Sequence, residues 1–246
     1  MSDATTIFHI YDRQVDDIER ALGDIFAREG REQAPRVEGT YSAVLERVVD
    51  PDVEATYRYL LLRPRATGWT TLIELGLRAE GLEVELSRAL GGASVIAIFT
   101  YGEVVAGYRV ARAGAEVDRY LSDPTAFEDA GAAPDADSTP LTDDEIEALR
   151  GRPERFADLL PPETPPDDFV RVVLRPGWWE ERDAAASGVA MPAGGGHEDD
   201  LVDEVDRARC IGLALEVWAP DNYPLAGDLK DIANAEAGPA IALAWR

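Results

Sequence analysis

The stretch from Trp69 to Pro124 constrains the fold of this chain more than any other, because strand-like and helix-like patterns alternate in it with turn signals between them. Residues 70–75 are β-branched and partly alternating, which is typical of a half-buried strand. Residues 94–99 form a continuous apolar run, as expected of a strand that is buried on both faces. The stretch therefore predicts a sheet with at least one fully buried strand.

The same stretch predicts one helix and two further strands. Apolar residues at i, i+4, i+7 and i+8 lie on one helical face, and Gly91-Gly92 ends the helix because glycine adopts the left-handed C-cap conformation without a Cβ penalty. Strands are expected at 104–111 and 116–121, with a short turn between them. Short turns favour an antiparallel meander from Ser94 to Leu121 with the helix packed on one face. The apolar residues of that helix are Leu82, Leu86, Ala89 and Leu90.

Before this stretch, the chain predicts a strand, an amphipathic helix and one arm of a hairpin. Residues 5–11 alternate enough to form a strand, and Asp12 is placed to cap the helix that follows. Residues 55–63 are aromatic and apolar, and we expect them to form a hairpin with residues 70–75. The buried stripe of the helix is expected to consist of Val15, Ile18, Leu22, Ile25 and Phe26.

The remainder of the chain sets the expected domain organisation. Thr142 and Glu145 have the spacing of a capping box, in which each side chain satisfies an unpaired donor at a helix start. We predict an α+β protein whose core domain spans residues 1–160, with a mostly antiparallel sheet and two or three packed helices. Residues 161–168 are proline-rich and predict an extended linker. Residues 169–246 are expected to form a smaller αβ segment packed on the core.

The chain is strongly acidic, with 48 acidic and 24 basic residues and a net charge of −24. It has no basic patch or tail, and Lys230 is its only lysine, so we expect no nucleic-acid partner. One interpretation is solvation in a salt-rich cytoplasm, where repulsion is screened over about 3 Å at 1 M salt. The preference for arginine fits such a halophilic adaptation. The alternative is an acidic surface that docks on a basic protein.

Cysteine usage and hydropathy indicate a cytoplasmic protein. Cys210 is the only cysteine and lies in an apolar run, so it predicts a buried structural thiol and no intrachain disulfide. The first residues lack the basic region and apolar core of a secretory signal. No apolar run approaches the roughly 18 residues of a membrane span. We therefore expect neither export nor a membrane partner.

A candidate metal site lies near the end of a glycine-rich run. His197 is followed by Glu198, Asp199 and Asp200, which together supply one imidazole and three carboxylates. Oxygen ligands suit a hard divalent cation, and the histidine shifts the preference towards a transition metal. The alternative is a loop whose acidic residues complement the positive end of a following helix.

Few other residues suggest chemistry. His9 lies inside the first strand, where a hydrogen-bonded structural histidine is the better interpretation and a ligand the alternative. Glu74 lies within an apolar run and is a candidate general acid or base if burial raises its pKa, although an outward-facing strand position explains it equally well. The chain contains no phosphate loop, dinucleotide fingerprint, paired-cysteine motif or nucleophile elbow, so we predict no cofactor.

Trp178 and Trp179 form the one adjacent tryptophan pair. If the backbone there is extended, they point to opposite sides, so that one is buried and the other is an exposed anchor for a protein or ligand. The alternative is that they pack the last third of the chain onto the first.

The leading functional hypothesis is a non-catalytic cytoplasmic protein that acts through protein–protein contacts. It rests on the absence of nucleotide, zinc and nucleophile signatures and on the scarcity of histidine and cysteine. The alternative is a metal-binding protein or metal-dependent hydrolase that uses His197 and its neighbouring carboxylates. Composition leaves the oligomeric state open.

Overall fold

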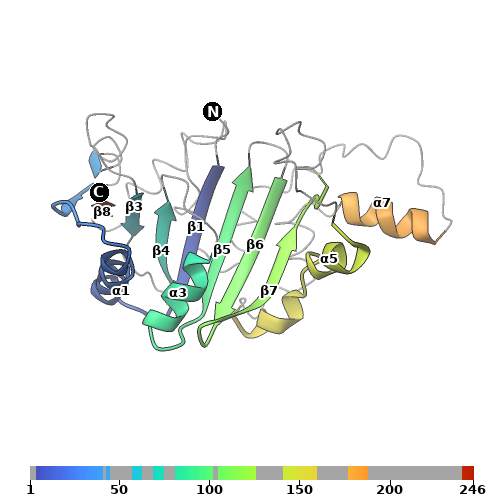
Figure 1. Cartoon of the computed structure of the whole chain (residues 1–246), viewed down its shortest axis with the longest axis horizontal. Helices are drawn as coiled ribbons and strands as arrows, with labels where there is room; N and C mark the ends of the chain where they lie inside the picture. The colour runs from blue at the N-terminus through green and yellow to red at the C-terminus, as the bar shows by residue number, and fades with distance from the viewer. Residues whose placement is uncertain are drawn as a thin grey trace.

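A computed structural model describes residues 4–40, 43–44, 57–62, 69–74, 81–101, 105–125, 141–159, 177–187 and 240–246. The strands in these ranges are β1 (Ala4–Tyr11), β2 (Val37–Gly39), β3 (Tyr57–Leu62), β4 (Trp69–Glu74), β5 (Val95–Tyr101), β6 (Val105–Arg112), β7 (Ala115–Leu121) and β8 (Ala240–Trp245). The helices are α1 (Val15–Arg28), α3 (Leu82–Ala89), α5 (Asp143–Ala148), the 3-10 helix η1 (Pro153–Leu159) and α7 (Gly177–Ala186). The protein therefore has the predicted α+β class (Figure 1).

The eight described strands form one sheet in the order β2-β8-β3-β4-β1-β5-β6-β7, and each described pairing is antiparallel. The predicted meander is confirmed, since β5, β6 and β7 are consecutive neighbours. The predicted hairpin is confirmed by the pairing of β3 with β4. Between these two units lies β1, the first strand of the chain, which pairs with β4 on one side and β5 on the other.

One face of the sheet is covered by α1 and α3 (Figure 1). The predicted apolar stripe of α1 is buried, and so are Leu82 and Leu86 of α3. They pack against Phe8 and Ile10 of β1 and against Val95 of β5. The helix α1 starts after Gln14 rather than at the expected cap Asp12, whose φ of 51° places it in a left-handed turn.

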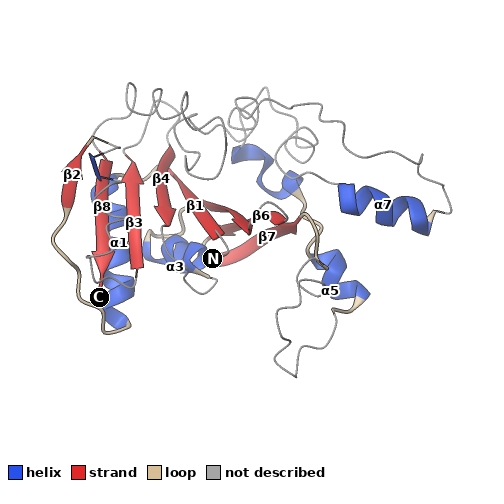
Figure 2. Ribbon diagram, turned by 90° about the horizontal axis from the view of Figure 1, so that it is seen from above, coloured by secondary structure: helices blue, strands red, loops and turns tan. Residues whose placement is uncertain are grey.

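The opposite face, near β7, is covered by a second apolar cluster that includes residues of η1 and α7. Tyr108 of β6 donates a hydrogen bond to Asp118 Oδ2 of β7 at 2.6 Å, and the backbone N–H of Arg152 donates to the same oxygen at 2.7 Å. This carboxylate therefore joins the sheet to the segment that leads into η1. Both α5 and α7 lie at the β7 end of the sheet (Figure 2).

The last described strand, β8, lies inside the sheet between β2 and β3. Its Trp245 is buried against Phe26 of α1 and Tyr59 of β3, with ring centroids 4.6 and 5.9 Å away. Part of the predicted segment 169–246 is thus built into the sheet. The predicted linker 161–168 lies outside the described residues, so the domain division stays a prediction.

Candidate functional site

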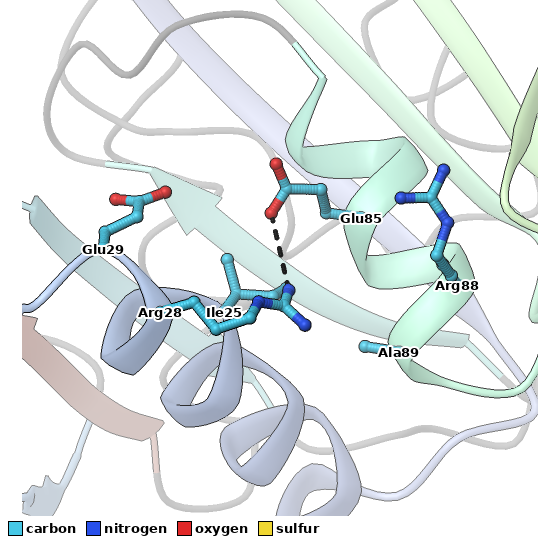
Figure 3. A pocket seen from close by; sticks show the side chains of 6 residues that line it. All are labelled: Ile25, Arg28, Glu29, Glu85, Arg88 and Ala89. Atoms are coloured by element: carbon cyan, nitrogen blue, oxygen red, sulfur yellow. Dashed lines mark ion pairs between the residues drawn. The ribbon is translucent and has the colours of Figure 1, made fainter.

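A groove with a volume of about 540 Å³ lies between α1 and α3 (Figure 3). The groove forms because the last turn of α1 faces the middle and end of α3, and Arg28 approaches Glu85 across it. Both helices are amphipathic, so their apolar faces pack on the sheet while their polar flanks face each other. The groove is lined by Ile25, Arg28, Glu29, Glu85, Arg88 and Ala89.

Charged side chains from both helices define the walls of the groove. Arg28 Nη2 lies 3.9 Å from Glu85 Oε2, and the two side chains are 66% and 37% exposed. The guanidinium of Arg88 is turned away from α1, and its Nη2 donates a hydrogen bond to the carbonyl of Gly114 at 3.1 Å (Figure 3). With Glu29, the lining holds two arginines and two glutamates, so it is charge-balanced in a chain whose net charge is −24.

A buried ion pair holds the inner side of α3 on the sheet. Arg109 Nε of β6 lies 3.3 Å from Glu83 Oε1, and the side chains are only 6% and 1% exposed. Burial raises the pKa of Glu83, and the nearby Arg109 guanidinium offsets part of that effect. Among the described residues Glu83 Oε2 has no hydrogen-bond partner, so the ionised carboxylate is incompletely solvated. The guanidinium of Arg109 also stacks over the ring of Phe99 at 4.9 Å.

Ser87 fixes the other end of α3. Its hydroxyl is buried, donates to the carbonyl of Ala93 at 2.7 Å and accepts from the backbone N–H of Gly114 at 3.0 Å. These bonds join α3 to the turn between β6 and β7. They also occupy the hydroxyl, so Ser87 serves as a structural anchor for the wall of the groove.

His9 has the environment expected of a structural histidine. It is buried on the face opposite α1 and α3, and its Nδ1 lies 3.2 Å from Thr71 Oγ1. Burial lowers its pKa to about 3, so the imidazole is neutral at physiological pH. The sheet separates it from the groove.

Glu74 does not face outwards, which corrects one of the two interpretations offered for it. Its side chain is buried and accepts a hydrogen bond from the hydroxyl of Tyr59 at 2.9 Å. Since Tyr59 belongs to the core cluster under α1, this carboxylate lies inside the protein. A general acid–base role for Glu74 stays untested.

The tryptophan pair lies on helix α7, so the interpretation that depends on an extended backbone does not apply. Trp179 is only 3% exposed, and its Nε1 donates to the carbonyl of Leu121 at 2.8 Å. Trp178 is half-buried and meets Trp179 edge to face at 4.9 Å. Arg150 stacks over Trp179 and forms a two-pronged ion pair with Asp183, which anchors α7. An interaction role for the pair stays a prediction.

The proposed metal ligands His197, Glu198, Asp199 and Asp200 lie outside the described residues. Within the described ranges, no group of three or more histidine, cysteine, aspartate or glutamate side chains is arranged to hold a metal ion. The metal hypothesis therefore stays a prediction.

No helix in the described ranges has both the length and the hydropathy of a membrane span. Comparison with known protein families, with curated proteins and with solved structures finds no match for this chain. The α+β fold and the groove are therefore the basis for assigning a function. The sequence did not predict the groove, because its two walls belong to helices that become neighbours only after the sheet has assembled. The only signal in the sequence was the charged flank of each helix.

Proposed function

We propose that this chain is a non-catalytic protein that acts by binding a protein partner, and that the groove between α1 and α3 is the contact surface. The observation that carries the proposal is the charge-balanced lining of that groove in an otherwise strongly acidic molecule. A protein surface can approach such a site without the repulsion that a uniformly negative surface imposes on acidic partners.

The chemistry of the groove supports binding rather than catalysis. Among the described residues, its lining carries no histidine, cysteine, serine or tyrosine that could serve as a nucleophile or a proton shuttle. Glu85 is partly exposed and lies beside Arg28, which is the opposite of the apolar burial that prepares a carboxyl group for proton transfer. The groove offers ionic contacts over an apolar floor formed by Ile25 and Ala89.

The proposal includes a cytoplasmic location and a solvating role for the excess acidic residues. Several arginines elsewhere on the described surface are held in close pairs with acidic residues, such as Arg36 with Glu19 at 2.7 Å and Arg112 with Asp158 at 2.7 Å. The remaining carboxylates hydrate the surface, most usefully in a salt-rich cytoplasm. Solvation alone therefore explains the excess of carboxylates, without docking of the whole acidic surface on a basic protein.

The test compares two charge reversals. Arg28→Glu places a third carboxylate in the groove, whereas Arg152→Glu makes the same change at an exposed position beyond the opposite face of the sheet. Partners captured from the source lysate are identified, purified and titrated against each variant. We expect Arg28→Glu to weaken binding at least about tenfold, or 1.4 kcal/mol, and Arg152→Glu to leave it unchanged. Equal binding by both variants would overturn the groove as the contact surface.

A further inference from the structure

Arg13, which lies just before α1, reaches across to the end of α3. Its side chain is half-buried, and its Nε and Nη2 both donate hydrogen bonds to the carbonyl of Leu90, at 3.1 and 3.0 Å. Leu90 is the C-cap of α3, where helix carbonyls lack intrahelical partners and the helix dipole favours a cation. Because a guanidinium is planar and its donors are fixed, the contact has a direction as well as a charge.

The backbone of Arg13 is itself held on the sheet. Thr70 of β4 is fully buried, and its Oγ1 donates a hydrogen bond to the carbonyl of Arg13 at 2.7 Å. Two residues earlier, the N–H of Tyr11 donates to the carbonyl of Ser94 at 3.0 Å, which joins the chain that enters α1 to the chain that leaves α3. The guanidinium is therefore held out towards α3 from a fixed base.

This contact joins the two walls of the groove. Ala89, which lines the wall formed by α3, is adjacent to Leu90, while Ile25 lines the wall formed by α1. Ser87 holds α3 to the turn between β6 and β7, and its printed bonds leave α1 untouched. Apolar packing holds both helices on the sheet, but it is non-directional. Hydrogen bonds of defined direction are needed to fix how far apart the two helices lie.

We infer that Arg13 is the positioning residue of the groove, because its clamp on the carbonyl of Leu90 sets the spacing between α1 and α3. This inference rests on the proposed function, since the spacing matters only if a partner binds between the two helices. Arg13 does not line the groove, so it acts on binding through the walls and not through contact with the partner.

The first experiment measures the spacing in the full chain without any partner. Spin labels are attached to Ala27→Cys on α1 and Val84→Cys on α3, in a background where Cys210→Ser removes the native thiol. Electron paramagnetic resonance then gives the distribution of distances between the two labels. We expect Arg13→Ala to shift and broaden this distribution, because the directed contact between the helices is lost.

Arg20→Ala is the matched control, since Arg20 is an exposed arginine of α1 that pairs with Asp17 of the same helix at 3.1 Å. It should leave the distance distribution unchanged. Arg13→Lys keeps the charge, so it serves if Arg13→Ala does not fold; one ammonium cannot reproduce the fork, and the distribution should broaden again. An unchanged distribution in the folded Arg13 variant, or an equal change in Arg20→Ala, overturns the inference.

Chemical rescue separates positioning from general loss of stability. A low concentration of guanidinium chloride should restore the wild-type distribution in Arg13→Ala, because the ion can occupy the vacated place beside the carbonyl of Leu90. Sodium chloride at the same ionic strength should not. A variant that is merely destabilised would be weakened further by guanidinium, which is a denaturant, and that result overturns the inference.

The second experiment titrates the purified partner identified in the Arg28→Glu test against the Arg13 variants. We expect Arg13→Ala to bind at least about tenfold more weakly than the wild type, and guanidinium to restore most of that loss. If binding depends on Arg28 but not on Arg13, the inference fails and the proposed function survives. If the spacing depends on Arg13 but Arg28→Glu binds normally, the proposed function fails and the spacing role of Arg13 stands.

Discussion

Glu83 and Arg109 form an almost fully buried ion pair between α3 and the sheet, and burial dominates the properties of this carboxyl group. Charged groups on two strands surround it: Arg109 on β6, and Glu116 and Arg119 on β7. Arg109 and Arg119 favour the ionised carboxylate, while burial and Glu116 oppose it. Because burial outweighs these arginines and Glu83 Oε2 lacks a hydrogen-bond partner among the described residues, the pKa of Glu83 lies above its ordinary value of 4.5.

Because the pKa of Glu83 is raised in the folded state, its protonated form stabilises the fold. This contribution to the free energy of unfolding is fully present below pH 4.5 and is lost as the pH rises through the folded pKa. We therefore expect Glu83→Gln to raise the free energy of unfolding at pH 7 and to match the wild type near pH 4. The measurement is urea unfolding of both proteins across this pH range, with Glu85→Gln as the exposed control on the same helix.

The opposite result has a clear physical meaning. If Glu83→Gln loses about 3–5 kcal/mol at pH 7, as expected when one partner of a buried pair is removed, the attraction of Arg109 outweighs the desolvation of the carboxylate. The pKa of Glu83 would then be lowered in the folded state, contrary to the direction that its burial imposes.

At the scale of secondary structure, the sequence predicted the elements whose periodicity is strong. The apolar stripe of α1, the short helix α3 with its glycine end and the strands of the meander all lie where expected. Thr142 and Glu145 form the capping box that their spacing predicts. In each case a local pattern decides the structure: apolar residues recur at the period of the helix or strand, and the capping residues have the spacing of a helix start.

Helix α7 shows where local patterns fail. It contains Gly177, two tryptophans and three consecutive alanines, and its amphipathic character is weak. Its position depends on contacts distant in sequence, such as Trp179 with Leu121 and Asp183 with Arg150. The three alanines, residues 184–186, therefore form the last turn of a helix that no local pattern predicts.

The two tryptophans provide a matched test of how α7 is held. Trp179→Phe leaves the carbonyl of Leu121 without the indole N–H, which should cost about 1–3 kcal/mol of stability. Trp178→Phe should cost clearly less, because that side chain is only half-buried. Chemical denaturation of both variants measures the difference. Equal losses would mean that the hydrogen bond to Leu121 does not anchor the helix.

At the scale of the whole molecule, sheet order was beyond the reach of sequence reasoning. Sheet order depends on which strand edges remain unpaired after the hairpins have formed. This decides that β1 lies between β4 and β5, and that β8 lies between β2 and β3. The groove follows from the same arrangement, since the order of the strands sets which helices become neighbours on one face. Its charge balance is visible only after α1 and α3 are brought together.

The net charge of −24 leads to a prediction for the intact protein. Potassium chloride at about 1–2 M should raise the midpoint of thermal unfolding, because it screens repulsion among the carboxylates. We expect no divalent cation to add a further rise in that salt. A rise that one cation still produces, and that His197→Ala abolishes, would favour the metal-binding alternative instead.

The position of β8 has a consequence for how the protein is made. Synthesis runs from the amino terminus, so β3 and β4 leave the ribosome long before the strand that will pair with β3. During that interval the outer edge of β3 offers unpaired backbone groups to any other strand nearby, including that of a neighbouring nascent chain. Completion of the sheet must therefore wait until β8 is synthesised, and the yield of native protein should depend on how well a chaperone shields that edge until β8 arrives.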